Sequence, residues 1–163
     1  QRVESSMKGV FSGRYTAEMA DPVILFAIGM RVNRLLAIHR WLLPTFNTLR
    51  LWIHLKTSPP EGYLYGYLYL YWRGIGMMQY WKNFDSLEAF AHDMNQPHLK
   101  SWRQLAVQTE SDRTFGYWHE TYEIEPDKTE AIYGSMPVFG LAAASNHVEL
   151  KAKENSARGR LKK

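Results

Sequence analysis

The stretch of residues 62–84 constrains the fold most, because tyrosine occupies alternate positions along its first half. In GYLYGYLYLYW, five tyrosines share one parity, while leucine, glycine and tryptophan share the other. Side chains alternate across a strand, so this pattern predicts a strand with a phenol face and an aliphatic face. Residues 73–76 (RGIG) and the run MMQYWKNF then predict the turn and second arm of a β-hairpin.

The tyrosine row, which comprises the five tyrosines of residues 63–71, suits neither water nor a dry core. It is too apolar to be left in water, and a buried hydroxyl needs a hydrogen-bond partner. A second sheet, a second subunit or a ligand cavity would meet both needs. We therefore expect helices on the aliphatic face, and we name Tyr65, Tyr67 and Tyr69 as candidate substrate-binding residues.

The first helix is predicted at residues 34–57, after a buried strand at 21–33 (DPVILFAIGMRVN). Pro44 interrupts this helix and is expected to kink or restart it. Its apolar residues recur every three or four positions, so they predict one stripe facing the core. The stripe consists of Leu35, Ile38, Leu42, Phe46, Leu49 and Ile53.

The second helix is predicted to be capped by Asp85, with Glu88 completing a capping-box-like pair, and to break near Pro97. Residues 115–125 (FGYWHETYEIE) predict the last strand. The order is therefore β-α-β-β-α-β, which is the ferredoxin-like α+β arrangement with two helices on one face of an antiparallel sheet. The other face lacks cover, so we expect a homodimer whose two sheets face each other.

The chain of 163 residues is long enough for one domain with a core. We expect a flexible N-terminus at 1–9, a ferredoxin-like α/β-barrel domain at 10–145, and a disordered basic tail at 146–163. The net charge of +4 lies in the tail, because residues 148–163 carry six Lys/Arg and two Asp/Glu. The other 147 residues carry 14 charges of each sign, which argues against nucleic-acid binding.

The chain contains no cysteine, so disulfides and thiolate chemistry are excluded. This composition fits a reducing compartment, and we expect a cytoplasmic protein. The longest apolar run is shorter than the roughly 18–20 residues that span a bilayer, so we expect no membrane span. The histidines show neither HxxxH nor HExxH spacing, so a metal site built from protein ligands alone is not expected.

Two histidines are candidates for chemistry. His119 lies in the last strand, where adjacent Glu120 faces the opposite side, and imidazole titrates near neutrality. His119 is either a general acid/base facing a cavity or a core histidine with a backbone or tyrosine partner. His98 lies at a predicted helix start, where the helix dipole disfavours imidazolium. It is either a base or haem ligand, or a solvated residue of the first helical turn.

Three further residues are candidates for substrate binding. Arg31 lies near a strand end, where it either binds an acidic group or is solvated. Trp81 and Asn83 share a parity on the third strand. They either line the cavity with an aromatic wall and an amide or pack at an edge.

Several segments together resemble a family of small proteins grouped with the monooxygenase of the fungal fumagillin pathway. The motifs are IGMRVN (28–33), QYW (79–81), HLKSW (98–102) and WHETY (118–122), and the resemblance covers residues 10–145. Members of this family resemble the antibiotic-biosynthesis monooxygenases. The resemblance implies a dimeric ferredoxin-like α/β barrel that oxygenates a hydrophobic secondary metabolite with O₂ and without a cofactor.

The order of His98 and His119 is also similar to that of haem aldoxime dehydratases. In that family a haem-ligating histidine near a helix start precedes a catalytic histidine in a strand. Three hypotheses follow. The first is a monooxygenase in which His119 is the base. The second is a haem-dependent lyase or dehydratase with His98 as the axial ligand. The third is a non-enzymatic dimer that binds an apolar ligand.

Overall fold

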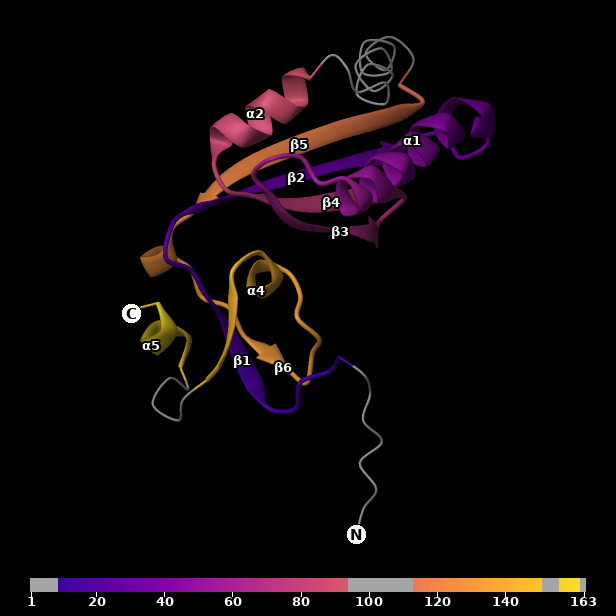
Figure 1. Cartoon of the computed structure of the whole chain (residues 1–163). Helices are drawn as coiled ribbons and strands as arrows, with labels where there is room; N and C mark the ends of the chain where they lie inside the picture. The colour runs from indigo at the N-terminus through magenta and orange to yellow at the C-terminus, as the bar shows by residue number, and fades with distance from the viewer. Residues whose placement is uncertain (1–8, 94–112, 151–155, 162–163) are drawn as a thin grey trace. The chain divides into compact units, whose positions relative to one another are not determined.

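The computed structural model describes residues 9–93, 113–150 and 156–161 (Figure 1). The chain forms two compact units. One comprises Ile24–Glu123, and the other comprises Gln1–Val23 with Ile124–Lys163. This division differs from the single domain expected at 10–145.

The unit formed by Ile24–Glu123 is built on a four-stranded sheet with the order β3-β4-β2-β5. Its elements are β2 (Val23–Val32), α1 (Ile38–Thr57), β3 (Tyr63–Tyr71), β4 (Gly74–Trp81), α2 (Phe84–His92) and β5 (Phe115–Ile124). Chain order and sheet order are those of the ferredoxin-like fold, so the predicted fold class is confirmed.

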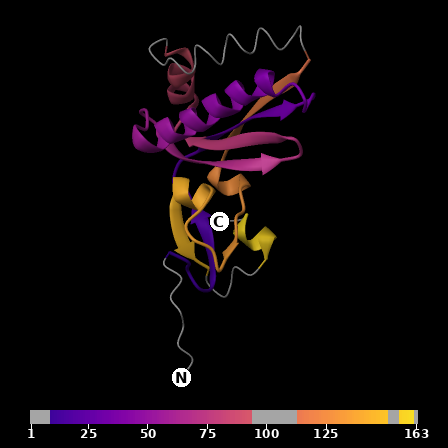
Figure 2. The same ribbon diagram turned by 90° about the vertical axis from the view of Figure 1, so that its right-hand side faces the viewer.

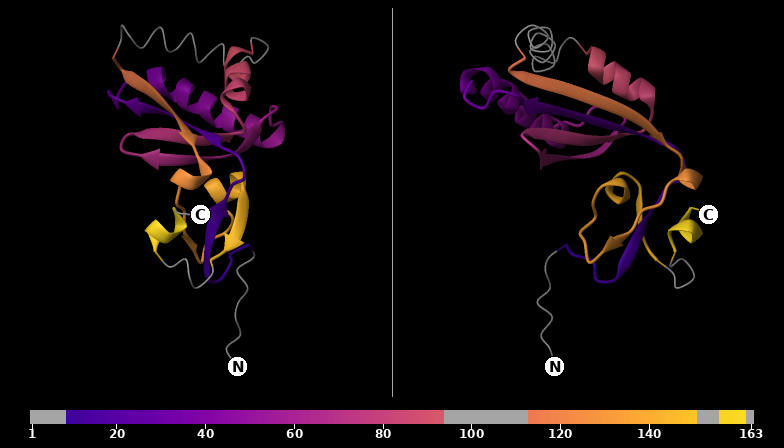
Figure 3. Two further views of the ribbon diagram at one scale, coloured as in Figure 1. Left: turned by 90° about the vertical axis from the view of Figure 1, so that its left-hand side faces the viewer. Right: turned by 180° about the vertical axis from the view of Figure 1, so that it is seen from behind.

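Both described helices of this unit pack on the same face of the sheet, as Figure 2 and Figure 3 show. One core cluster joins both helices to β2 and β4. It consists of Ile24, Leu51, Leu55, Met77, Trp81, Leu87 and Phe90. Even-numbered residues of β2 and odd-numbered residues of β4 therefore face the helices, and the opposite parities face away.

The face of α1 that packs on the sheet is not the predicted one. Its buried residues are Pro44, Asn47, Thr48, Leu51 and Leu55, whereas the six residues of the predicted stripe are exposed. The prediction is wrong because α1 is apolar on both sides and polar residues interrupt the buried side. Thr48 is tolerated there because its hydroxyl donates to the carbonyl oxygen of Pro44 at 3.0 Å. Pro44 itself lies inside one continuous helix.

The tyrosine row is broken at its first member. The pairing of β3 with β4 shifts register between Tyr63 and Tyr65, which marks a β-bulge. Tyr63 therefore packs on the helix side, with its ring 5.3 Å from that of Trp81. The other four tyrosines keep one parity and lie on the face away from the helices.

The second unit contains a three-stranded sheet with the order β6-β1-β7. Its elements are β1 (Arg14–Glu18), the 3₁₀ turn η1 (Pro126–Lys128), β6 (Tyr133–Gly134), α4 (Leu141–Ala144), β7 (Asn146–Glu149) and α5 (Ala157–Arg160). The range 146–163 was expected to be disordered because it is polar, yet it contributes β7 and α5. Residues 146–149 are ordered because β7 pairs with β1 through backbone hydrogen bonds, which the polar composition of this range does not indicate. The range 1–9 lies outside the described residues except for Gly9.

None of the helices among the described residues combines the length and the apolar composition that a membrane span requires.

Candidate active site

His119 lies in the middle of β5 on the side of the sheet that faces the helices. Its ring centroid is 5.7 Å from that of Phe26, which packs against the core cluster beneath α1 and α2. His119 is exposed, so its imidazole has a hydrophobic neighbour on one side and access to small molecules on the other.

Trp118 precedes His119 and therefore points to the opposite face. Its indole Nε1 donates to Tyr71 Oη at 2.7 Å, and Tyr71 Oη donates to the carbonyl oxygen of Met30 at 2.8 Å. His119 and the four tyrosines of residues 65–71 thus lie on opposite faces of the sheet. The structure does not bring them together around one cavity within this unit.

The tyrosines of β3 form a continuous layer of rings. Successive ring centroids are 6.2 Å apart from Tyr65 to Tyr67, 6.4 Å from Tyr67 to Tyr69 and 5.7 Å from Tyr69 to Tyr71. Burial, and then the neighbouring Tyr71, raise the pKa of Tyr69. The rings together present an aromatic surface that carries hydroxyl groups.

Glycines of the central strands make room for these rings. A Cβ atom on Gly76 would lie 2.4 Å from Tyr69 Cζ, and one on Gly29 would lie 2.8 Å from Trp118 Nε1. Gly29 and Gly76 are paired across β2 and β4, so they form one strip of bare backbone. The aromatic layer therefore lies flat across the sheet, which single-strand periodicity does not reveal.

Arg31 and Trp81, two further residues predicted to bind substrate, both contact other side chains of the fold. The guanidinium Cζ of Arg31 lies 4.2 Å from the ring centroid of Trp72, and Arg31 Nη1 donates to Asn33 Oδ1. Trp81 is fully buried in the core, where its Nε1 donates to Gln79 Oε1 at 3.1 Å. These contacts fit packing roles at both positions.

Asn83 caps α2 by accepting a hydrogen bond from the Ser86 amide at 2.9 Å. The helix therefore starts two residues earlier than predicted, with Asn83 rather than Asp85 as its cap.

His98 and the break predicted near Pro97 lie outside the described residues. Among the residues that are described, no group of three His, Cys, Asp or Glu side chains is placed to hold a metal ion. His119 is thus the one predicted catalytic residue whose surroundings the structure shows.

Sequence reasoning did not identify a carboxylate–phenol pair beside the tyrosine row. Tyr122 Oη donates to Glu120 Oε2, and this hydrogen bond raises the pKa of Tyr122. Glu120 also contributes to the raised pKa of Tyr69, so the pair borders the aromatic layer. The two-residue spacing of Glu120 and Tyr122 within a strand was the signal that could have found it.

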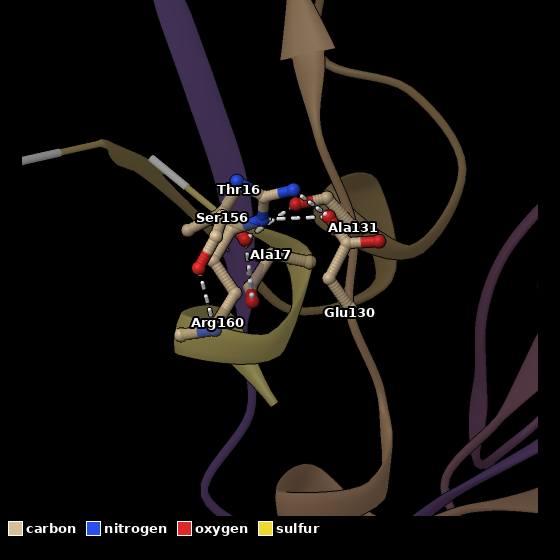
Figure 4. Close-up of polar contacts among 7 residues, drawn as sticks. Thr16, Ala17, Glu130, Ala131, Ser156 and Arg160 are labelled. Atoms are coloured by element: carbon tan, nitrogen blue, oxygen red, sulfur yellow. Dashed lines mark hydrogen bonds and ion pairs between the residues drawn. The ribbon is translucent and has the colours of Figure 1, made fainter. Parts of the chain in front are cut away.

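A cavity of about 210 Å³ lies in the other unit. Thr16 Oγ1 donates to the carbonyl oxygen of Ala131 at 2.8 Å, and Arg160 Nε donates to Glu130 Oε1 at 2.6 Å (Figure 4). The first bond connects β1 to residue 131, and the second connects α5 to the adjacent residue 130, so α5 is linked to β1 through this segment. The cavity is lined by Thr16, Ala17, Glu18, Met19, Pro126, Thr129, Ala131, Leu141 and Arg160. It holds no residue that the sequence analysis had named.

Comparison with known protein families identifies the family to which the chain belongs. The model of the monooxygenase af470-like family matches residues 23–141, which include the whole ferredoxin-like unit. The chain belongs to this family. This membership agrees with the expectation of an enzyme of the monooxygenase type.

Solved structures resemble the chain at low sequence identity. Aldoxime dehydratase OxdRE in complex with butyraldoxime is 13% identical, with a TM-score of 0.61 over 92% of this chain. The chain spans 43% of the length of that protein. SnoaB, a cofactor-independent oxygenase from Streptomyces nogalater, is 13% identical, with a TM-score of 0.42 over 63% of this chain and 92% of its own. The curated proteins contain no match.

Proposed function

We propose that this monooxygenase oxygenates a hydrophobic secondary metabolite and that His119 is its acid–base residue. The observation that carries the proposal is the position of His119, exposed on the helix-facing side of β5 and 5.7 Å from the ring of Phe26. An apolar substrate would lie against Phe26 while His119 reaches its acidic proton.

The proposed reaction needs no external reductant. His119 takes a proton from an activated CH₂ group of the substrate, and the resulting carbanion reduces O₂ and forms a C–O bond. The O–O bond then breaks, so one oxygen atom stays as a carbonyl and the other leaves as water. The balance is CH₂ + O₂ → C=O + H₂O, with the substrate supplying all the electrons. Phenolic and polyketide substrates form such anions, because the negative charge is delocalised.

The haem-dependent lyase remains the second candidate. In that enzyme His98 would hold the haem iron and His119 would act as the acid–base residue toward the substrate. The described residues contribute only His119 to such a site, so we propose no haem-dependent step. An absorption spectrum of protein expressed with a haem precursor separates the two candidates. A Soret band that disappears in His98→Ala supports the haem enzyme, and a spectrum of aromatic residues alone supports the cofactor-free oxygenase.

Isotope-labelled O₂ tests the proposed function directly. A panel of phenolic and polyketide substrates is incubated with the protein, and the products are analysed by mass spectrometry. One labelled oxygen atom in the product and one in water supports the proposal. Oxygen uptake that stays at the background level across the panel, with a haem-free protein, contradicts it.

We also propose that a second copy of the chain covers the aromatic layer. The described helices of the unit, α1 and α2, both pack on the other face of the sheet. A homodimer with facing sheets would bury the tyrosine rings, whose hydroxyl groups can remain hydrogen-bonded at such an interface. Tyr65, Tyr67 and Tyr69 then act at the subunit interface, and their contact with substrate depends on a pocket between the two copies.

A further inference from the structure

The outward side of α1 carries a continuous apolar stripe. Its members are between 37% and 55% exposed and recur at spacings of three and four, so they align on one side of the helix. We call them the outward stripe, and they are Ile38, Leu42, Phe46, Leu49 and Ile53. Leu43 borders the stripe at 57% exposure. A contiguous apolar surface of this kind marks an interaction site, whereas scattered single residues do not.

The chemistry around the outward stripe is cationic. Residues 22–60 contain five Arg/Lys and no Asp/Glu. The guanidinium Cζ of Arg50 lies 6.0 Å from the ring centroid of Phe46, a member of the stripe. Lys56 Nζ lies 4.6 Å from the ring centroid of Trp52 on the same helix. An apolar stripe bordered by cations and free of acidic residues is typical of helices that lie on membrane surfaces.

We propose that α1 binds an anionic lipid surface, with the outward stripe inserted at the level of the headgroups. The opposite side of α1 packs in the core through Leu51 and Leu55, so the helix lies on the bilayer and does not cross it. Arginine and lysine then face the lipid phosphates while the apolar side chains leave water. Because apolar metabolites partition into lipid, this position also suits the proposed substrate class, although the inference does not depend on it.

A second copy of the chain is a poor occupant of this surface. Two α1 helices packed through their outward stripes would bring together two surfaces that each carry Arg50 and Lys56. Neither helix offers an acidic residue to pair with them. Like charges of this kind oppose association, whereas an anionic surface attracts them.

Vesicle sedimentation with the full chain tests the proposal. Vesicles of phosphatidylcholine are compared with vesicles that contain one third phosphatidylserine. We expect binding to the anionic vesicles, and at least a tenfold weaker affinity in about 1 M salt, where the Debye length is about 3 Å. The double variant Leu42→Gln/Phe46→Gln should weaken binding at least tenfold. The matched control is Leu70→Gln, which makes the same change at a residue that is 84% exposed on β3, and it should bind like the wild type.

A fluorescent label provides a second readout that does not need the double variant. Because the chain has no cysteine, Leu42→Cys and Leu70→Cys each place one environment-sensitive dye. We expect a blue shift on adding anionic vesicles for the label at position 42 and none at position 70. Equal binding by wild type and double variant would mean that the basic tail attaches the protein, and the proposal would be wrong. A double variant that falls from dimer to monomer in sedimentation would assign the stripe to a second copy and overturn it too.

Discussion

At the scale of single residues, Tyr63 shows how the chain resolves the conflict inside its tyrosine pattern. The β-bulge turns its ring toward the helices, where it lies 5.3 Å from the ring of Trp81. Its hydroxyl oxygen is buried and has no hydrogen-bond partner among the residues that the structure describes. Burial, together with the neighbouring Tyr65, raises the pKa of Tyr63 to about 12. Tyr63 therefore packs as a large hydrophobic side chain, and its buried hydroxyl group destabilises the fold.

Removing that hydroxyl should stabilise the fold. A buried polar group without a partner costs about 1–3 kcal/mol, so Tyr63→Phe should raise the free energy of unfolding by roughly 1 kcal/mol. Urea denaturation of the two proteins at pH 7 measures the difference. Tyr122→Phe is the control, because Tyr122 Oη is exposed and bonded to Glu120. A Tyr63→Phe variant less stable than the wild type would show that the hydroxyl has a partner in solution.

The raised pKa of Tyr63 also predicts a dependence of stability on alkaline pH. The unfolded chain loses this phenolic proton near pH 10, while the folded chain holds it to about pH 12. The stabilising contribution of the neutral phenol is thus fully present below pH 10 and is lost as the pH rises through 12. The free energy of unfolding of the wild type should fall more steeply over this range than that of Tyr63→Phe. Parallel slopes for the two proteins would contradict the assignment.

At the scale of elements, the glycine strip beneath the aromatic layer decides how β3 and β4 can pack. A Cβ atom on Gly76 would lie 2.4 Å from Tyr69 Cζ, so Gly76→Ala must displace that ring. We expect a loss of about 1–3 kcal/mol in the free energy of unfolding. The control is Gly116→Ala in β5, where the nearest atom to a Cβ would be Asn33 Nδ2 at 3.9 Å. Equal losses in both variants, measured by urea denaturation, would mean that strand propensity and not the ring sets the cost.

The order of the elements was predictable, because it rests on periodicity within each segment. Alternation marked β3 and β5, and the continuous apolar run marked β2 as a central strand. The buried side of α1 was not predictable, since its outward stripe has the stronger period and its inner side includes Asn47 and Thr48. The bulge at Tyr63 was hidden as well, because a register shift is a property of two paired strands and not of one sequence.

The candidate site was only half predictable for the same reason. His119 was identified from its residue type and its place in a strand. Its side of the sheet relative to the tyrosine row depends on the three strand pairings that connect β5 to β3, and one sequence without an alignment does not fix them. Phe26 lies beside His119 because of the way β2 and β5 pair in the sheet. No pattern within β2 alone could identify Phe26 as that neighbour.

At the scale of the whole molecule, the proposed homodimer is the prediction on which the tyrosine row depends. Analytical ultracentrifugation at micromolar concentration should give the mass of two chains. Tyr67→Glu places a carboxylate in the middle of the aromatic layer and should shift the protein toward the monomer, because a buried charge without a partner is costly. Leu70→Glu, an exposed position of the other parity, is the control and should remain dimeric. A wild-type protein with the mass of one chain would contradict the proposal.

The catalytic role of His119 is tested most directly by oxygen uptake of His119→Ala with a substrate that the wild type oxygenates. His92→Ala is the control, because His92 is an exposed histidine on α2 whose Nδ1 lies 2.9 Å from the carbonyl oxygen of Glu88. Loss of an acid–base residue should lower the turnover rate by about 100-fold or more, while the dissociation constant for substrate stays near the wild-type value. Turnover by His119→Ala at the wild-type rate would contradict the assignment of His119 as the acid–base residue.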